Sequence, residues 1–319
     1  MAKAGIGATS AISQEIDVRS DRVSNKIAAQ NFNYAYSSMR NCRDGDQWTI
    51  TIADGPEPAC DVLAVATARS NAPVAVKLAE LAAIIRLRAR AVEKLTAAYR
   101  ALGSEAEYDA GRELETAIDE ATASATQLGT ALGIGPVTEV VASSAKFIGG
   151  QLAENAHQRR LVRGSARLQA ITRHLRLALE QERKRHEQVD SVAGDIEAET
   201  RRHLTTAGLL EASPTLREIM EASDFPAPDE GSLIMALEED PRLRAATQVT
   251  AIADGGPNGD PALSAAIDLL AALEVEHEAF QARREVSTAA VSVSIDRLAE
   301  IVERASSADP QAAAATWEE

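Results

Sequence analysis

Apolar residues recur at helical spacing along most of the chain, and the first such stretch covers residues 10–40. Ser10 stands at its start and is a residue type that commonly caps a helix N-terminus. The apolar positions lie four or seven residues apart and share one broad face: Ile12, Ile16, Val23, Ile27 and Tyr34. The pattern therefore predicts an amphipathic helix that begins near Ser10.

A second stretch begins at Pro73, because proline suits the first turn of a helix. A heptad-like seam follows, with Arg88 as its exception: Leu78, Leu81, Ile85, Val92, Leu95, Tyr99 and Leu102. Gly103 and Gly111 weaken the helix without necessarily ending it. The apolar face continues through Leu114, Ile118, Leu128 and Leu132. The pattern predicts one long arm that ends at the turn Gly133-Ile134-Gly135-Pro136.

A third stretch, from about Val137 to Leu210, predicts a second long arm. Its seam consists of Leu161, Gly164, Leu168, Ile171, Leu175, Ala178, Val189, Val192 and Ile196. Glu182 and Arg185 also fall on this seam, and we interpret them as a paired polar layer or a solvated stretch. Two long arms joined by a short turn must run antiparallel.

The remaining chain completes the predicted architecture. Residues 212–260 hold five prolines and predict an excursion of short helices, whereas Pro261 to about Ala305 predicts a last long helix. The expected fold is all-α, an elongated antiparallel helical hairpin or coiled-coil bundle of three long helices plus an N-terminal helix. The expected segments are residues 1–70, 71–211, 212–260, 261–305 and a frayed tail at 306–319.

Composition narrows the classes of partner. Aromatic residues make up only 3% of the 319 residues, so few rings are available to stack on bases or flavins. The formal net charge is −15, and such a surface repels nucleic acid phosphate and anionic lipid. We therefore expect no nucleic acid partner. The longest charge-free stretch is too polar for a spanning helix, which leaves room for membrane contact but not for crossing.

The two cysteines, Cys42 and Cys60, flank one loop rich in turn-forming residues. No second cysteine or histidine stands at zinc-ligand spacing from either of them. We interpret them as a disulfide that closes a small loop, which implies an oxidising compartment such as the bacterial periplasm. Residues 1–10 lack the pattern of a signal peptide, so this interpretation requires that an export signal was removed. Two unpaired cysteines in a cytoplasmic protein are the alternative.

Candidate catalytic and metal-binding residues are sparse. Four of the five histidines lie on the second arm, at spacings that do not place two side chains on adjacent turns. Glu274 and His277 match the Glu-x-x-His spacing of di-iron bundles once, which is close to chance in so charged a chain. Nucleophile elbows, Walker loops and dinucleotide fingerprints are missing from the sequence. We expect no enzyme activity, no metal and no cofactor.

Two surfaces are candidates for contact with a partner. The first is a basic run without acidic interruption between His157 and Leu179: Arg159, Arg160, Arg163, Arg167, Arg173 and Arg176. The partner-binding candidates within it are Arg159, Arg160, Arg163 and Arg167. The run would dock an acidic partner or lipid headgroups, or it would pair with acidic residues of neighbouring helices. The second is the weakly charged tip at 122–150, where the apolar candidates are Ile134, Val137 and Phe147.

These features predict a non-enzymatic helical scaffold or interaction protein of a bacterial cell envelope, with one or more protein partners. Association of copies through helical faces is a further expectation. The alternative is a membrane-acting helical protein, either a hairpin like that of pore formers or a curvature binder that resembles BAR domains in outline. This likeness is one of shape, and no motif supports it.

Overall fold

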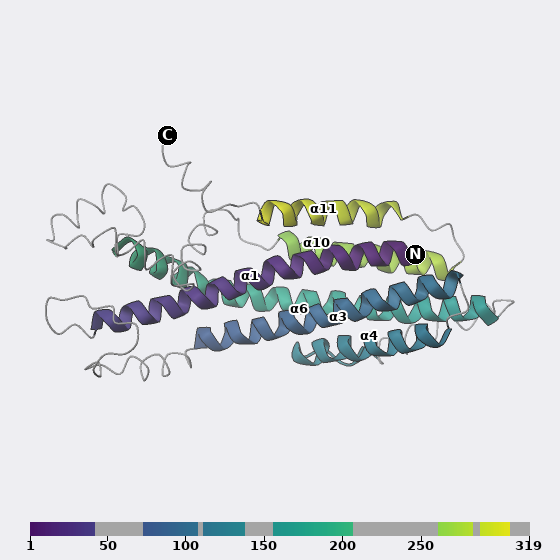
Figure 1. The fold of residues 1–319 in the computed structure, drawn as a ribbon, viewed down its shortest axis with the longest axis horizontal. Coiled ribbons are helices and arrows are strands. Elements are labelled where there is room, and N and C mark those ends of the chain that lie inside the picture. The colour runs from purple at the N-terminus through teal and green to yellow at the C-terminus, as the bar shows by residue number, and fades with distance from the viewer. Residues whose placement is uncertain (42–72, 108–110, 138–155, 207–260, 283–287, 307–319) are drawn as a thin grey trace, which may run out of the picture. The chain divides into compact units, whose positions relative to one another are not determined.

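The computed structural model describes residues 1–41, 73–107, 111–137, 156–206, 261–282 and 288–306 (Figure 1). These residues form helices α1 (Ala2–Asn41), α3 (Pro73–Glu107), α4 (Gly111–Ala131), α6 (Ala156–Thr206), α10 (Pro261–Gln281) and α11 (Ala289–Ser306). None of these residues lies in a strand, so the prediction of an all-α chain is confirmed for this part. Cys42, Cys60 and the excursion at 212–260 lie outside the described residues. The disulfide and the short helices therefore stay predictions.

The chain divides into two compact units. The first comprises residues 1–20, 81–187 and 258–307, and the second comprises residues 21–80, 188–257 and 308–319. In the second unit, Asn33 Nδ2 of α1 donates to Thr200 Oγ1 of α6 at 2.8 Å and to the Ile196 carbonyl at 3.2 Å. Both side chains are buried, so one amide holds these two helices in register. The first unit contains the polar networks on which the functional argument depends.

Helix α1 begins at Ala2 and not near Ser10, so the predicted start was wrong. Ser10 is an exposed position within the helix. The physical reason lies in packing: a Cβ added at Gly5 would come within 2.3 Å of the Tyr99 ring on α3. Glycine is a poor helix former, but here it permits a close approach that a larger residue would block. Tertiary contact outweighs local propensity.

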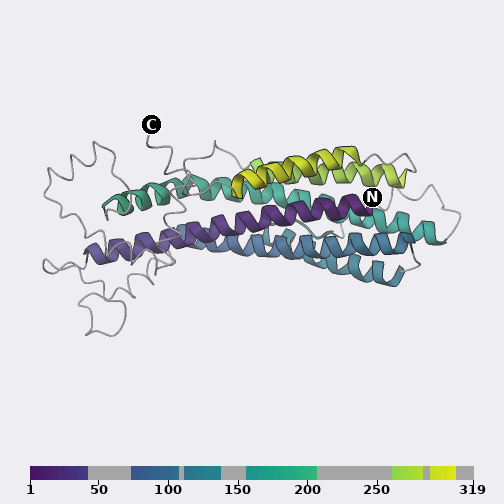
Figure 2. The same ribbon diagram turned by 45° about the horizontal axis from the view of Figure 1, so that its top comes forward.

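The predicted first arm is not one straight helix. Lys94 of α3 and Glu120 of α4 lie 26 residues apart, and their charged atoms are 3.0 Å apart. In a continuous helix they would be separated by roughly 39 Å at 1.5 Å per residue. Helix α4 therefore folds back along α3, which the two views of Figures 1 and 2 both show. This return buries Leu114, Ile118 and Leu128, and that apolar burial outweighs the loss of helix continuity.

The predicted turn after this segment is confirmed at residue level. Helix α4 ends at Ala131, and Gly133 adopts φ 75°. The Ile134 amide donates to the Gly129 carbonyl at 2.7 Å, and the Gly133 amide donates to the Thr130 carbonyl at 3.1 Å. This pair of bonds is the Schellman motif, which satisfies the carbonyls at a helix C-terminus.

The predicted last long helix is also two helices. Arg297 Nη1 of α11 lies 3.5 Å from Asp268 Oδ2 of α10, although a straight helix would separate these residues by roughly 43 Å. Helix α11 therefore returns along α10, as both views show (Figures 1 and 2). The return places Val291, Leu298 and Val302 in buried positions. No proline or glycine marks this break in the sequence, so periodicity alone did not detect it.

The predicted core positions are largely confirmed. Every seam residue expected on α3 is buried: Leu78, Leu81, Ile85, Val92, Leu95, Tyr99 and Leu102. On α6 the buried seam residues include Leu168, Ile171, Leu175, Ala178, Val189 and Ile196. Leu161 is partly exposed. Apolar periodicity therefore located the packing faces even where it misplaced the ends of helices.

Candidate functional site

A layer of charged side chains crosses the first unit between α1, α3 and α6. Arg88 occupies the exceptional position on the α3 seam, and its side chain is fully buried. Its Nη2 lies 2.9 Å from Glu15 Oε2 of α1, and its Nη1 lies 3.2 Å from Glu182 Oε1 of α6. The sequence left two interpretations open for Glu182, a paired polar layer or a solvated stretch, and the structure shows the paired layer. Arg185, its predicted companion on the seam, is exposed.

The contacts of Arg88 are ion pairs of imperfect alignment. No nitrogen of its guanidinium makes a hydrogen bond of normal geometry with a described residue. The two carboxylate oxygens of Glu182 also lack such a hydrogen bond among the described residues. Coulomb attraction at low dielectric, and not directional hydrogen bonding, therefore compensates the burial of these charges. Burial alone would raise the pKa of Glu182, but the positive charge of Arg88, helped by His186 and Arg19, lowers it below its ordinary value.

Helix α1 contributes a second arginine to this layer. Arg19 Nε donates to Glu15 Oε1 of its own helix at 2.5 Å. Its Nη1 lies 3.1 Å from His186 Nε2 of α6. An arginine nitrogen can only donate, so a hydrogen bond between these two atoms requires the tautomer of His186 that carries its proton on Nδ1. The same Nε2 lies 3.4 Å from Glu182 Oε1.

A second polar network lies among α3, α6 and α10. Tyr99 Oη lies 2.7 Å from His277 Nε2 and 3.0 Å from Thr172 Oγ1, and Ser165 Oγ lies 2.8 Å from His277 Nδ1. The Tyr99 and His277 rings also stack, with centroids 5.7 Å apart. Burial lowers the pKa of His277 to about 3 and raises the pKa of Tyr99. The imidazole is therefore neutral, with both ring nitrogens bonded.

A serine hydroxyl beside an imidazole is the pairing that activates nucleophiles. Here Ser165, Thr172, Tyr99 and His277 are all fully buried, so a substrate has no approach to them in this structure. Their hydroxyls and ring nitrogens bond one another across three helices. The arrangement therefore works as an internal contact that aligns the helices.

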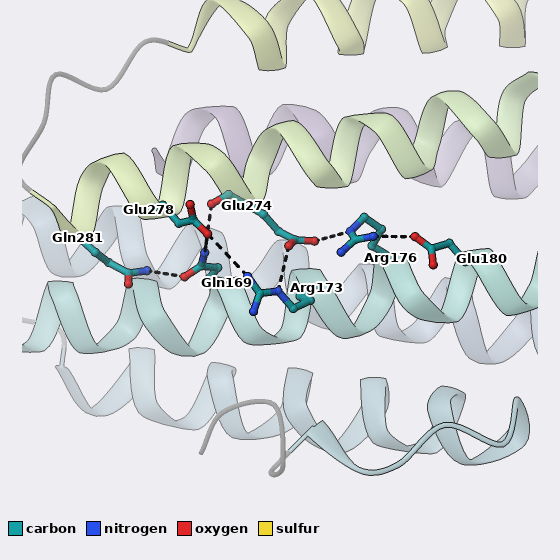
Figure 3. Close-up of polar contacts among 7 residues, drawn as sticks. All are labelled: Gln169, Arg173, Arg176, Glu180, Glu274, Glu278 and Gln281. Atoms are coloured by element: carbon teal, nitrogen blue, oxygen red, sulfur yellow. Dashed lines mark hydrogen bonds and ion pairs between the residues drawn. The ribbon is translucent and has the colours of Figure 1, made fainter. Parts of the chain in front are cut away.

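Most of the basic run pairs with acidic side chains of neighbouring helices. Arg173 Nε and Arg176 Nε contact the two carboxylate oxygens of Glu274 on α10, at 3.1 and 2.7 Å (Figure 3). Glu274 thus bridges two arginines on successive turns of α6. The same view shows Gln169 Nε2 donating to Glu278 Oε1 and Gln281 Nε2 donating to Gln169 Oε1. The interpretation of this run as a set of interhelical ion pairs is confirmed for these residues.

The four arginines predicted to bind a partner divide into two classes. Arg160 Nε donates to the buried Glu105 of α3 at 2.8 Å, and Arg167 pairs with Asp119 of α4. Arg159 and Arg163 are exposed, and neither forms an ion pair with a described residue. They lie four residues apart and so share one face of α6. These two remain as the open part of the predicted basic surface.

The apolar candidates at the tip lie in different surroundings. Val137 is fully buried, and Ile134 is partly exposed beside the Gly133 turn. Phe147 lies outside the described residues. Val137 therefore belongs to the packed interior in this structure and does not present a contact surface, whereas Ile134 keeps that potential.

The Glu-x-x-His match does not form a metal centre. Glu274 is held by two arginines and His277 by two hydroxyls. Over the six described ranges, no group of three or more His, Cys, Asp or Glu side chains is placed to hold a metal ion. The same ranges contain no helix long and apolar enough to cross a membrane.

Sequence reasoning missed part of both networks. Glu15 and Arg19 follow Ile12 at three and seven residues, so they share its apolar face, and this spacing was an available signal of buried charge. The contact of Tyr99 with His277 joins residues 178 apart in the chain, for which a single sequence carries no signal.

Comparison with known proteins provides no further assignment. No family model, no curated protein and no solved structure matches this chain.

Proposed function

We propose that this chain is a non-enzymatic helical interaction protein of a bacterial cell envelope. The observation that carries the proposal is the charged layer of Glu15, Arg19, Arg88, Glu182 and His186. A buried layer of this kind penalises every alternative register, because a shift would leave charges unpaired at low dielectric. It favours a rigid arrangement of α1, α3 and α6, which is what a scaffold requires. We propose that this charged layer lies within the antiparallel helical bundle that the sequence predicts.

The contact surface that we propose is the exposed pair Arg159 and Arg163 on α6. The chain carries a net charge of −15, so an exposed basic pair on one helix face is a local exception to the prevailing sign. Such a pair fits an acidic segment of a protein partner, since complementary charge guides association and orientation.

The test compares two charge reversals of equal size. Arg159→Glu with Arg163→Glu should lose the partner in a pull-down from a native envelope extract. The control is Arg86→Glu with Arg90→Glu, two exposed residues that are also four apart, on α3. We expect the control to retain the partner. Equal loss in both variants, or full retention in both, contradicts the proposed surface.

Vesicles decide between a protein partner and a lipid surface. The interaction-protein proposal expects no co-sedimentation with anionic phospholipid vesicles. Sedimentation that depends on Arg159 and Arg163 would replace it with the membrane-acting alternative. The proposed envelope location depends on the predicted Cys42–Cys60 disulfide, which titration of thiols tests separately.

A further inference from the structure

We propose that the C-terminal half of α4, residues 121–131, is a cover over His174 of α6 that opens more often in mildly acidic solution. We call these residues the α4 cover. This inference does not depend on the proposed function. It follows from the burial of one imidazole, without a partner for either ring nitrogen, beneath a helical segment that carries no charge.

The α4 cover contains a notch that His174 enters. The ring is fully buried, and neither of its nitrogens makes a hydrogen bond of normal geometry with a described residue. A Cβ added at Gly129 would lie only 2.2 Å from His174 Nε2, so this nitrogen lies directly against the glycine. Ala121 and Ala125 precede Gly129 at intervals of four residues and share its face. Small apolar residues therefore admit a polar ring without satisfying it.

The covered ring favours the neutral form. Burial lowers the pKa of His174 below its ordinary value of 6.5, and the Ala125 carbonyl, which favours the protonated ring, does not outweigh burial. When the α4 cover opens, water reaches the ring and its pKa returns toward 6.5. The open form therefore binds a proton more tightly than the closed form. As the pH falls below 6.5, the equilibrium shifts toward the open form by linkage.

Charged side chains near His174 do not offset the burial of its ring. Their contacts are ion pairs with other charged residues, and among the described residues none of them contributes to the pKa shift of His174. On α6 these side chains are Arg167, Arg173, Arg176 and Glu180, on α4 they are Asp119 and Glu120, and on α3 they are Arg88 and Lys94. A proton on the covered ring would thus be a buried charge without a described counterion.

The two halves of α4 are held by different contacts, so opening can be local. The N-terminal half buries the large side chains of Leu114 and Ile118, and its last two residues, Asp119 and Glu120, form ion pairs with α6 and α3. The α4 cover buries four residues, of which only Leu128 is larger than alanine. Less apolar area is buried there, so we expect the cover to open while the N-terminal half stays packed.

Hydrogen exchange measured by mass spectrometry on the full chain tests this device. After correction for intrinsic exchange rates, peptides covering residues 121–131 should exchange about three- to tenfold faster at about pH 5.5 than at about pH 7.5. The upper limit applies to a ring that is protonated only in the open form. His174→Gln cannot titrate and should remove this difference. His157→Gln changes a partly exposed histidine of the same helix and should preserve it.

A second control separates local opening from unfolding of the whole unit. His277 is also buried, so opening of the unit as a whole would expose it to protons as well. His277→Phe should therefore leave the pH dependence at residues 121–131 unchanged. Loss of this dependence in His277→Phe overturns the proposal, as does exchange of these residues that does not depend on pH or that depends on it equally in His174→Gln.

A measurement on the wild-type chain keeps the test independent of any variant. Nuclear magnetic resonance shifts of the His174 ring, followed as the pH is lowered, should show half-protonation below pH 6.5, because the closed form dominates. A ring that is half protonated at or above pH 6.5 overturns the proposal, since the cover would then not disfavour the proton.

Discussion

The buried layer makes a sharp prediction for Arg88→Met. Methionine fills a similar volume but removes the charge that lies between Glu15 and Glu182. Glu15 keeps Arg19 as a partner, whereas Glu182 keeps the weaker contact with His186 and the electrostatic attraction of Arg19. Removing one member of a buried ion pair costs about 3–5 kcal/mol, because the other charge stays desolvated and uncompensated.

A double variant separates the cost of burial from the value of the pair. Arg88→Met with Glu182→Met removes both charges and leaves apolar side chains that pack in their place. Apolar replacement of a buried pair is often neutral or stabilising by about 1–4 kcal/mol. The double variant should therefore be more stable than Arg88→Met alone. This order of stabilities is the opposite of what additive loss predicts.

Urea unfolding followed by far-ultraviolet circular dichroism provides the measurement. The chain has two compact units, so the midpoint of each transition is compared before any free energy is derived. Lys94→Met is the control, because it breaks an ion pair whose side chains are 40% and 52% exposed and should leave the midpoints nearly unchanged. If Arg88→Met behaves like this control, or if the double variant is the least stable, the layer is not a desolvated ion-pair network.

The pH dependence of stability in the same variants tests whether the ionised Glu182 stabilises or destabilises the fold. The pKa of Glu182 lies below its ordinary value of 4.5, so it contributes stability above that value, which is lost as pH falls through the folded pKa. In Arg88→Met, burial becomes the dominant influence and raises the pKa of Glu182. The contribution then reverses, and mild acidification should recover part of the stability that the variant lost at neutral pH.

Three further predictions address other parts of the chain. Gly129→Ala places a Cβ 2.2 Å from a buried imidazole nitrogen and should destabilise the fold by about 1–3 kcal/mol in thermal unfolding. In the control Gly103→Ala, the added Cβ meets its nearest neighbour at 3.4 Å, so this variant should be as stable as the wild type or slightly more stable. Burial lowers the pKa of His277 from 6.5 to about 3, so between these pH values the unfolded chain binds one more proton at this residue than the folded chain does. The free energy of unfolding of the wild type should therefore decrease as the pH falls below 6.5, and His277→Phe should remove this contribution to its pH dependence. Thiol titration of the denatured, unreduced chain should find no free thiol at Cys42 and Cys60, and two free thiols would contradict the predicted disulfide and the envelope location.

The sequence predicted the packing faces better than the path of the chain. Leu95 and Leu168 stand at regular seam spacing, and both are fully buried, because helical periodicity reports a local requirement for burial. Arg88 interrupted the seam without leading to a prediction, although the structure places it at the centre of the charged layer; a polar layer was considered from Glu182 and Arg185 instead. The partner helix of a buried charge depends on the fold as a whole, so Glu15 was not identified from its own neighbourhood.

The return of α4 and of α11 could not be predicted for a related reason. A helix that continues and a helix that folds back present the same apolar stripe, and only the packing of distant elements selects between them. Gly111 provided a hint at the first return, but the second return follows Gln281 without glycine or proline. The start of α1 was missed because Gly5 favours close contact with Tyr99 over local helix propensity.

At the end of α4, a single backbone angle determines which type of residue fits. At Gly133 an added methyl group would meet nothing within 4 Å, so space does not restrict this position. The φ of 75° restricts it instead, since residues of L chirality rarely adopt that conformation. The position therefore selects for handedness and not for size, and glycine fits because it is achiral. A chemically synthesised chain with a D-amino acid at this position would satisfy the same demand and would lose less freedom on folding than glycine does.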